Sequence, residues 1–316
     1  MAANAAPAQV ASKDAFPARP IMLIVSFPAG GPSDALARAI AQAMSTHLKQ
    51  SVVVENIGGA SGTIGLAKLV NSPPDGYTLG FGTIGTHVAN AALFKKLPYD
   101  PLGSFEPVGL AGTAPTVLVA KSALPVADLR EFVAYVDTHR ARMTYGSAGI
   151  GSISHYACVI LLSALKQHIT HVPYRGVAPA MNDLMGGHID FMCDQSTTAL
   201  PQVAGGKIKA IAVLSDQKLP QLPAVATAAS AGYSDVNVRS WNALFAPKGT
   251  PPHIIKRLND ALRAATSDAG LIKQMQAVGV DLPSPDNLAP GTVSELITLG
   301  LARDMPALKA RGEYLD

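Results

Sequence analysis

Short apolar runs alternate with helix-forming stretches along almost the whole chain. The runs at residues 21–26 and 52–56 have the length and β-branched content of buried strands. After the first of them, the Ala-rich stretch 34–48 favours a helix. Such alternation with short connections is typical of α/β architecture with mostly parallel sheets, in which ligands bind beyond the carboxyl ends of the strands.

The same pattern continues toward the C-terminus. Strands are predicted at residues 21–26, 52–56, 79–82, 107–111, 117–120, 143–145, 171–173, 189–194 and 210–214. Helices are predicted at residues 34–48, 63–69, 86–92, 126–140, 154–165, 178–185, 199–204, 251–267 and 270–278. Asp128 is expected to cap its helix, and Pro251-Pro252 suits a first helical turn.

Two glycine- and serine-rich loops each join a predicted strand to a predicted helix. They are Phe27-Pro-Ala-Gly-Gly-Pro-Ser-Asp34 and Gly146-Ser-Ala-Gly-Ile-Gly-Ser152. A glycine loop that opens a helix exposes backbone N–H groups, and the helix dipole adds partial positive charge there. Two such loops, about 120 residues apart, predict two lobes that hold one anionic ligand between them.

The composition fits a protein with a large core and excludes several classes. The chain has 316 residues, of which 48% are hydrophobic and 15% charged, enough for two ordinary domains. The net charge is +3 and the basic residues are scattered, so no nucleic-acid partner is predicted. No apolar stretch approaches the roughly 18–20 residues of a membrane span.

The N-terminus lacks a basic region followed by an apolar core, so it is not an intact secretory signal. Residues 1–10 resemble the Ala-rich start of a mature exported chain with a methionine in front, and a disordered cytosolic tail fits the composition equally well. Two cysteines, Cys158 and Cys193, permit one disulfide without requiring it. A pair of small buried hydrophobic side chains is the prediction for them.

An ordered series of motifs identifies a family. The matching stretches are Phe27 to Asp34 with Ala37-Arg38, Glu55-Asn-Ile-Gly-Gly-Ala-Ser-Gly62 with Gly65, Pro74-Asp-Gly-Tyr-Thr-Leu79, Gly146 to Ser152 with His155, Val172-Pro-Tyr-Arg-Gly176 with Pro179-Ala180, Gly187-His-Ile-Asp190, Gly206-Lys-Ile-Lys-Ala210, Trp241 and Ala246-Pro-Lys-Gly-Thr-Pro251. In this order they resemble the tripartite tricarboxylate transporter substrate-binding receptors, also called the Bug family. The resemblance runs from about Pro20 to the C-terminus.

The resemblance implies a two-lobed periplasmic-binding-protein fold of type II topology, with a ligand cleft between the lobes and two hinge crossings. Lobe one is expected at residues 1–117, with a disordered start, and 240–316; lobe two is expected at 118–239. It also implies a periplasmic receptor, without its signal peptide here, that is monomeric and passes a small carboxylate to membrane transporter subunits. No cofactor is implied.

Carried over residue by residue, the resemblance assigns a ligand carboxylate to the first glycine loop, at Phe27, Ala29, Gly30 and Asp34. The loop at Thr83, Thr86 and His87 is expected to close the wall of lobe one. Ser147, Gly151 and Ser152 are expected to contribute from lobe two. For several of these residues a structural role is an open alternative, namely helix capping for Asp34 and Ser152.

Three further residues are predicted from their chemistry. Arg175 suits a distal carboxylate or an ordinary salt bridge, and Tyr174 with Phe27 suits a ligand ring or a core. Asp194 is the candidate partner for a ligand ammonium group. The other polar candidates are neutral, apart from Arg175 and His87, which are the candidate cations. An amine-free dicarboxylate, with an aromatic one favoured, is therefore predicted over an amino acid such as aspartate or glutamate.

A different class, a small-molecule transferase on a similar fold, is the alternative to a receptor. His155 and Cys158 stand three apart, but no oriented third partner suggests a nucleophile. His168 and His171 lack a carboxylate or cysteine companion, so no metal site is predicted. Since neither an activated nucleophile nor paired carboxylates accompany the glycine loops, the prediction is no enzyme and no catalytic residue.

Overall fold

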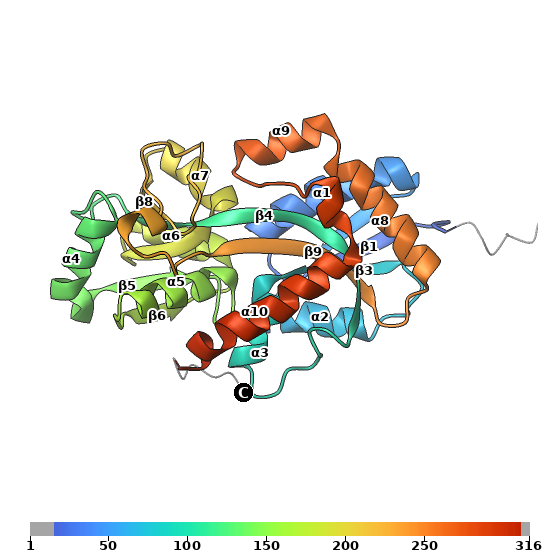
Figure 1. Ribbon diagram of the computed structural model, residues 1–316, viewed down its shortest axis with the longest axis horizontal. Coiled ribbons are helices and arrows are strands. Elements are labelled where there is room, and N and C mark those ends of the chain that lie inside the picture. The colour runs from blue at the N-terminus through green and yellow to red at the C-terminus, as the bar shows by residue number, and fades with distance from the viewer. Residues whose placement is uncertain (1–15, 311–316) are drawn as a thin grey trace, which may run out of the picture.

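The computed structural model describes residues 16–310, so the predictions for residues 1–10 and for a disordered start concern residues outside this range. Strands and helices gather at both ends of an elongated molecule (Figure 1). Two long strands, β4 (Phe105–Lys121) and β9 (Arg239–Pro247), run side by side between these ends.

The strands form one mixed sheet in the order β2-β1-β3-β9-β4-β7-β5-β6, with β8 also paired to β4. The remaining strands are β1 (Ile21–Val25), β2 (Val52–Asn56), β3 (Thr78–Thr83), β5 (Thr144–Ser147), β6 (Thr170–Pro173), β7 (Phe191–Gln195) and β8 (Ile208–Val213). β1 is parallel to β2 and β3, and β5 is parallel to β6 and β7. All pairings of β4 and β9 are antiparallel, so the expectation of mostly parallel sheets is wrong for these two strands.

β4 belongs to both halves of the sheet. Its residues 105–115 pair with β9, whereas residues 116–121 pair with β7 and β8. The two halves therefore repeat one order, β2-β1-β3-β9-β4 in lobe one and β6-β5-β7-β4-β8 in lobe two. In each lobe the fourth strand reaches in from the neighbouring lobe. This is the two-crossing, type II arrangement that the resemblance implies.

Helices cover both faces of each half. Lobe one carries α1 (Pro32–Leu48), α2 (Thr63–Val70), α3 (Asn90–Leu93), α8 (Pro252–Thr266), α9 (Ala269–Ala277) and α10 (Pro290–Ala310). Lobe two carries α4 (Leu129–His139), α5 (Ile153–Ala164), α6 (Val177–Gly186) and α7 (Ser196–Ala204). α10 packs on α3 in lobe one and also reaches α5 in lobe two. Two short segments lie near the cleft, a 3-10 turn at Ala60–Gly62 and a π-helix at Gly85–Ala89.

Alternation along β4 shows how the cores form. Val117 and Val119 point into the core beneath α6 and α7, whereas Leu118 and Ala120 point into the core that contains α5. All four side chains are fully buried. Because successive strand residues face opposite sides of a sheet, one apolar run serves two hydrophobic layers.

Local signals set several helix ends as predicted. The Asp128 carboxylate accepts a hydrogen bond from the Glu131 amide at 2.9 Å and begins α4. Pro252 occupies the first turn of α8. Other elements differ from the prediction. The strands expected at 107–111 and 117–120 are one continuous strand, and neither β9 nor α10 was expected.

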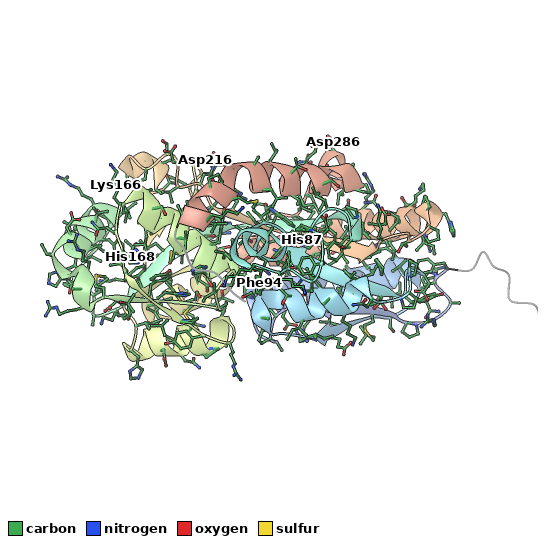
Figure 2. All side chains as sticks on the ribbon, turned by 90° about the horizontal axis from the view of Figure 1, so that it is seen from below. His87, Phe94, Lys166, His168, Asp216 and Asp286 are labelled. Atoms are coloured by element: carbon green, nitrogen blue, oxygen red, sulfur yellow. A yellow bond between two sulfur atoms is a disulfide. The ribbon has the colours of Figure 1, made fainter. Side chains whose placement is uncertain are left out.

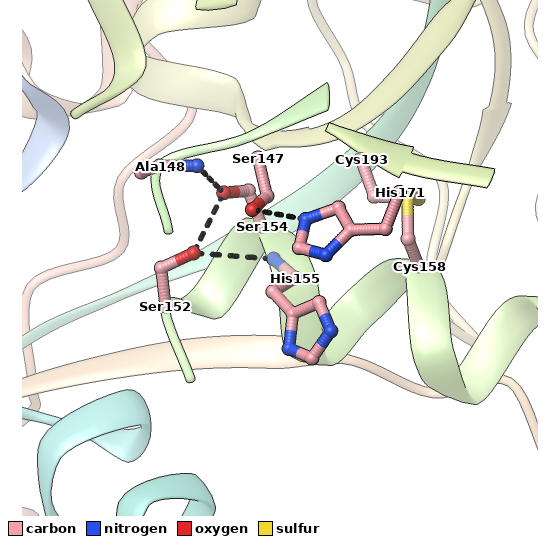
Figure 3. The surroundings of a disulfide bond; sticks show 8 residues. All are labelled: Ser147, Ala148, Ser152, Ser154, His155, Cys158, His171 and Cys193. Carbon is pink, nitrogen blue, oxygen red and sulfur yellow. Dashed lines mark hydrogen bonds between the residues drawn. A yellow bond between two sulfur atoms is a disulfide. The ribbon is translucent and has the colours of Figure 1, made fainter. Parts of the chain in front are cut away.

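The two cysteines are joined by a disulfide, so their prediction as unlinked hydrophobic side chains is wrong (Figure 3). Cys158 in α5 and Cys193 in β7 are both fully buried, with 5.4 Å between their Cα atoms. The bond fastens α5 to the central strands of lobe two. Sequence spacing alone carries no such signal, because the pairing depends on the contact between helix and sheet.

Candidate ligand-binding site

A cavity of about 900 Å³ opens between the lobes. Its walls are the connections that follow β1 and β2 in lobe one and β5 and β6 in lobe two, together with the end of α3. The lining residues are Phe27, Pro28, Ala29, Asn56, Gly58, Gly59, Ala60, Ser61, Gly62, Phe94, Ala148, Gly149, Ile150, Pro173, Tyr174, Arg175 and Gly176. The carboxyl ends of the parallel strands of both lobes therefore meet at this cavity, as predicted for α/β sheets.

A smaller pocket of about 30 Å³, called the inner pocket below, lies where several helices begin. Its walls include the first residues of α1, α5 and α6, and Gln195 directly before α7. The lining residues are Phe27, Pro28, Gly31, Pro32, Ser33, Thr83, Ala148, Ser152, Ile153, Gly176, Val177 and Gln195. First-turn N–H groups have no acceptor within their own helix, so this pocket collects backbone donors and the positive ends of several helix dipoles.

Asp34 serves the first glycine loop rather than the cavity. Its buried carboxylate accepts hydrogen bonds from the Gly30 amide at 2.9 Å, from Arg38 Nε at 3.0 Å and from Asn56 Nδ2 at 2.9 Å. Burial alone would raise its pKa, but the hydrogen bonds from Arg38, Gly30 and Asn56 outweigh that effect and lower it. Since its amide is used by Asp34, Gly30 supports the loop as well, and neither residue lines the cavity or the inner pocket.

Thr83 lines the inner pocket, whereas Thr86 and His87 lie behind it. The Thr86 hydroxyl is within 2.9 Å of the Thr83 amide and within 2.9 Å of His87 Nδ1. His87 lies in the half of the molecule that forms lobe one (Figure 2). Its fully buried ring stacks on Phe245 with 4.2 Å between ring centroids. Burial lowers the pKa of His87 to about 3, so this residue is neutral and does not provide the cation that was expected there.

The second glycine loop places its polar side chains against its own lobe (Figure 3). The Ser147 hydroxyl lies 2.7 Å from His171 Nε2 and accepts a hydrogen bond from the Gly149 amide at 3.1 Å. Ser152 lines the inner pocket and caps α5 by accepting from the His155 amide at 3.3 Å. Gly151 adopts a φ of +83° and donates its amide to His155 Nδ1. Ser147 and Gly151 do not line the cavity or the inner pocket.

Tyr174 and Arg175 both line the cavity after β6. The Tyr174 hydroxyl donates to Asp183 Oδ2 at 2.6 Å, and burial followed by the Asp183 carboxylate raises the pKa of Tyr174 to about 12. Its ring thus stays fixed as an apolar wall. Arg175 is exposed and forms no ion pair with any residue between 16 and 310, so its guanidinium is free to meet a ligand.

Asp194 is fully buried at the end of β7 and lines neither the cavity nor the inner pocket. One carboxylate oxygen accepts from the Thr198 hydroxyl, and the other has no hydrogen-bond partner within the described part of the chain. Burial raises the pKa of Asp194 to about 6 despite the hydrogen bonds from Thr198 and Gln195. The residue predicted to meet an ammonium group is therefore enclosed within lobe two.

Several lining residues were not among those predicted. They include Asn56, the turn from Gly59 to Gly62, Phe94, Ile150 and Gln195. Asn56 and Gln195 end strands, and the turn from Gly59 to Gly62 and Ile150 follow strands within a few residues, so strand position was the available signal. Phe94 ends the short helix α3 and carries no such signal.

The lining of the site is almost free of charged side chains. Among the described residues that line the cavity or the inner pocket, Arg175 carries the single full charge, and no carboxylate is present. Within residues 16–310 there is no group of three or more His, Cys, Asp or Glu side chains placed to hold a metal ion. No helix in that range has the length and apolar character needed to cross a membrane.

Two lobes with matching strand orders, two crossing strands and a cavity at the strand ends define a two-lobed solute-binding receptor. The model of the tripartite tricarboxylate transporter family receptor matches residues 36–312. The chain belongs to this family, which confirms the resemblance drawn from the motifs.

Solved structures of related receptors have the same fold. MatC from Rhodopseudomonas palustris with bound malate is 37% identical, with a TM-score of 0.89 over 93% of this chain and 100% of MatC. The periplasmic binding protein BugD is 35% identical, with a TM-score of 0.90 over 95% and 99% of the two chains. The R. palustris protein Rpa4515 with adipate is 30% identical, with a TM-score of 0.89 over 94% and 98%.

Proposed function

We propose that this protein is an extracytoplasmic receptor that binds a small dicarboxylate, with an aromatic one favoured, between its lobes. The convergence of the α1, α5 and α6 N-termini on the inner pocket carries the proposal. The first-turn N–H groups that no side chain caps, together with the helix dipoles, favour an anion at that point. One ligand carboxylate would bind there, and the rest of the ligand would extend into the larger cavity.

The larger cavity supports a second carboxylate and an apolar body. Phe27, Phe94 and Tyr174 provide aromatic surface, and Arg175, which has no ion-pair partner among residues 16–310, provides a guanidinium at the same wall. A planar guanidinium matches a carboxylate with two parallel hydrogen bonds. Malate and adipate, held by the related MatC and Rpa4515 structures, are both dicarboxylates, which agrees with this reading.

An amino acid ligand fits the site less well. Its ammonium group needs a carboxylate or several free carbonyl groups, and the lining contains no carboxylate. Asp34 is already bonded to three donors, and Asp194 is enclosed in lobe two. Without a carboxylate, the lining also lacks paired acid and base carboxylates, which argues against a transferase. The proposed mechanism is therefore closure of the lobes on the ligand without covalent chemistry.

The family supports further parts of the proposal. The receptor would act in the periplasm as a monomer and pass its ligand to the membrane subunits of a tripartite tricarboxylate transporter. The lobes would divide close to the predicted limits, because the pairing of β4 changes partner between Pro115 and Thr116 and its pairing with β9 ends at Arg239. Bending at these two crossings would open the cleft.

Titration calorimetry with a matched ligand panel tests the proposal. The panel contains malate, adipate and phthalate, their dimethyl esters, and aspartate. At least one diacid is expected to bind, its diester is expected to lose nearly all affinity, and aspartate is expected to bind more weakly than the best diacid. Undiminished binding of a diester would exclude a carboxylate site, and tighter binding of aspartate would make the protein an amino acid receptor.

A further inference from the structure

The turn from Gly59 to Gly62 in the cavity wall has an unusual backbone. Its two central residues, Ala60 and Ser61, adopt left-handed conformations with φ of 43° and 56°. This conformation is disfavoured for a residue with a side chain, because its Cβ atom lies too close to a carbonyl oxygen. Such strain persists where surrounding contacts hold it in place, and it often accompanies function.

Lobe one holds this turn through its carbonyl groups. The Thr63 hydroxyl donates to the Ala60 carbonyl at 2.8 Å, and Asn90 Nδ2 donates to the Ser61 carbonyl at 3.0 Å. The Ser61 hydroxyl is directed elsewhere. It donates to the backbone carbonyl of Ile150 in lobe two, so one side chain of the strained turn spans the cleft.

The two lobes are in direct contact around this bond, through the Asn90 side chain at one point and through backbone at another. A Cβ atom added to Gly151 would lie 2.3 Å from Asn90 Oδ1, and one added to Gly85 would lie 2.9 Å from the Gly151 carbonyl oxygen. A Cβ atom at either position would force its neighbour to shift, and the φ of +83° disfavours a side chain at Gly151 as well. The Ser61 hydroxyl therefore reaches Ile150 because the lobes are closed to contact distance here, and separation of the lobes would break the bond.

We propose that Ser61 is an interlobe latch that favours the closed arrangement of the receptor. Ser61 and Ile150 both line the large cavity, so their hydrogen bond seals one of its walls. The bond exists in the closed state alone, and its free energy shifts the open–closed equilibrium in that direction. Ser61 is a positioning residue for closure, and its effect on ligand retention rests on the proposed function.

Two substitutions separate the hydroxyl from the backbone strain. Ser61→Ala removes the hydroxyl and keeps the cost of the left-handed backbone, whereas Ser61→Gly removes both. Ser72→Ala is the matched control, because the Ser72 hydroxyl donates to the Lys68 carbonyl within lobe one. The ligand-free variants are compared by small-angle scattering and by amide hydrogen exchange of residues 149–153.

Both Ser61 variants are expected to show faster exchange in this segment, by about three- to tenfold for one lost hydrogen bond, and a larger radius of gyration. Ser61→Gly is expected to melt at a higher temperature than Ser61→Ala, and Ser72→Ala to exchange like the unaltered protein. Wild-type exchange and wild-type dimensions in Ser61→Ala would overturn the latch.

Adipate serves as the ligand probe in a second arm. Its dissociation from Ser61→Ala is expected to be about three- to tenfold faster, with little change in its association rate. Because closure is measured without ligand, failure of every carboxylate to bind would count against the proposed function while the latch is still decided by the exchange data.

Discussion

Asn56 Nδ2 donates a hydrogen bond to Asp34 Oδ1 at 2.9 Å and thereby ties the end of β2 to the first turn of α1. The same amide group donates to the Phe27 carbonyl at 3.0 Å. The shape of the first glycine loop, which forms part of both the cavity and the inner pocket, thus depends on an acceptor, Asp34, that does not itself line either of them.

Replacement of this acceptor should loosen the loop. In Asp34→Asn, one of the donors from Gly30, Arg38 and Asn56 would meet an amide NH2 group instead of an oxygen. We expect a loss of about 1–3 kcal/mol in the free energy of unfolding and weaker diacid binding. Denaturant unfolding and calorimetry measure the two effects. Asp216→Asn, an exposed aspartate in lobe two, is the control, and equal stability of both variants would contradict the role of Asp34.

The same carboxylate predicts acid sensitivity. The pKa of Asp34 is lowered in the folded protein, so the charged carboxylate is more stable in the folded than in the unfolded state. The stability that it contributes is complete above the unfolded pKa of about 4 and is lost as the pH falls through the folded value. Melting temperatures of Asp34→Asn and the unaltered protein should therefore converge as the pH falls below about 4. A constant difference would show that the charge is irrelevant.

Asp194 should have the opposite pH dependence. Its folded pKa is raised to about 6, so its stabilising effect is complete below the unfolded pKa of about 4 and is lost as the pH rises through 6. Asp194→Asn should be about 2–3 kcal/mol more stable than the unaltered protein at pH 7.5, from a shift of roughly two pKa units. Thermal unfolding at pH 4 is the internal control, because both side chains are then neutral. A variant that is less stable at pH 7.5 would contradict a net cost of burial.

The predictable part of the fold is the part that local pattern determines. The apolar runs of β1 and β2 and the Ala-rich α1 agree with the prediction within a few residues. β9 was missed because it is an antiparallel crossing strand that forms only when lobe two returns to lobe one. α10 was missed because Gly300 and Pro306 weaken its helical pattern. Gly300 is needed there, since a Cβ atom would lie 2.7 Å from Val88 Cγ2.

The candidate site was predictable in position and less so in detail. The glycine loops and strand ends locate the cleft, because parallel strands direct their carboxyl ends to one edge. The direction of each side chain depends on distant partners. Ser147 turns to His171, 24 residues away, and His87 stacks on Phe245, so neither reaches the cavity. No local pattern encodes such contacts.

The disulfide should stabilise lobe two without affecting the ligand. Replacing Cys158 and Cys193 together by alanine opens a loop with a sequence separation of 35 residues, which should cost about 2–4 kcal/mol. Diacid affinity should change less than about twofold, because neither sulfur lines the cavity. Differential scanning calorimetry with and without reductant compares the two proteins. Reductant should not change the melting temperature of the double variant. If the double variant melted at the same temperature as the oxidised unaltered protein, a structural role of the disulfide would be contradicted.

Arg175 should distinguish diacids from monoacids. Because it is the charged residue of the described cavity lining and has no ion-pair partner among residues 16–310, Arg175→Met should weaken a bound diacid by about 10- to 100-fold, the range for hydrogen bonds to charged groups. The affinity for the monomethyl ester of the same diacid should fall by less than about threefold in this variant. Arg175→Lys keeps the charge without the planar guanidinium, so its diacid affinity should lie between those of the unaltered protein and Arg175→Met. Calorimetry measures each pair, with Arg142→Met as the exposed control in lobe two. Equal losses for the diacid and its monoester would mean that Arg175 attracts anions through its net charge and does not bind the second carboxylate.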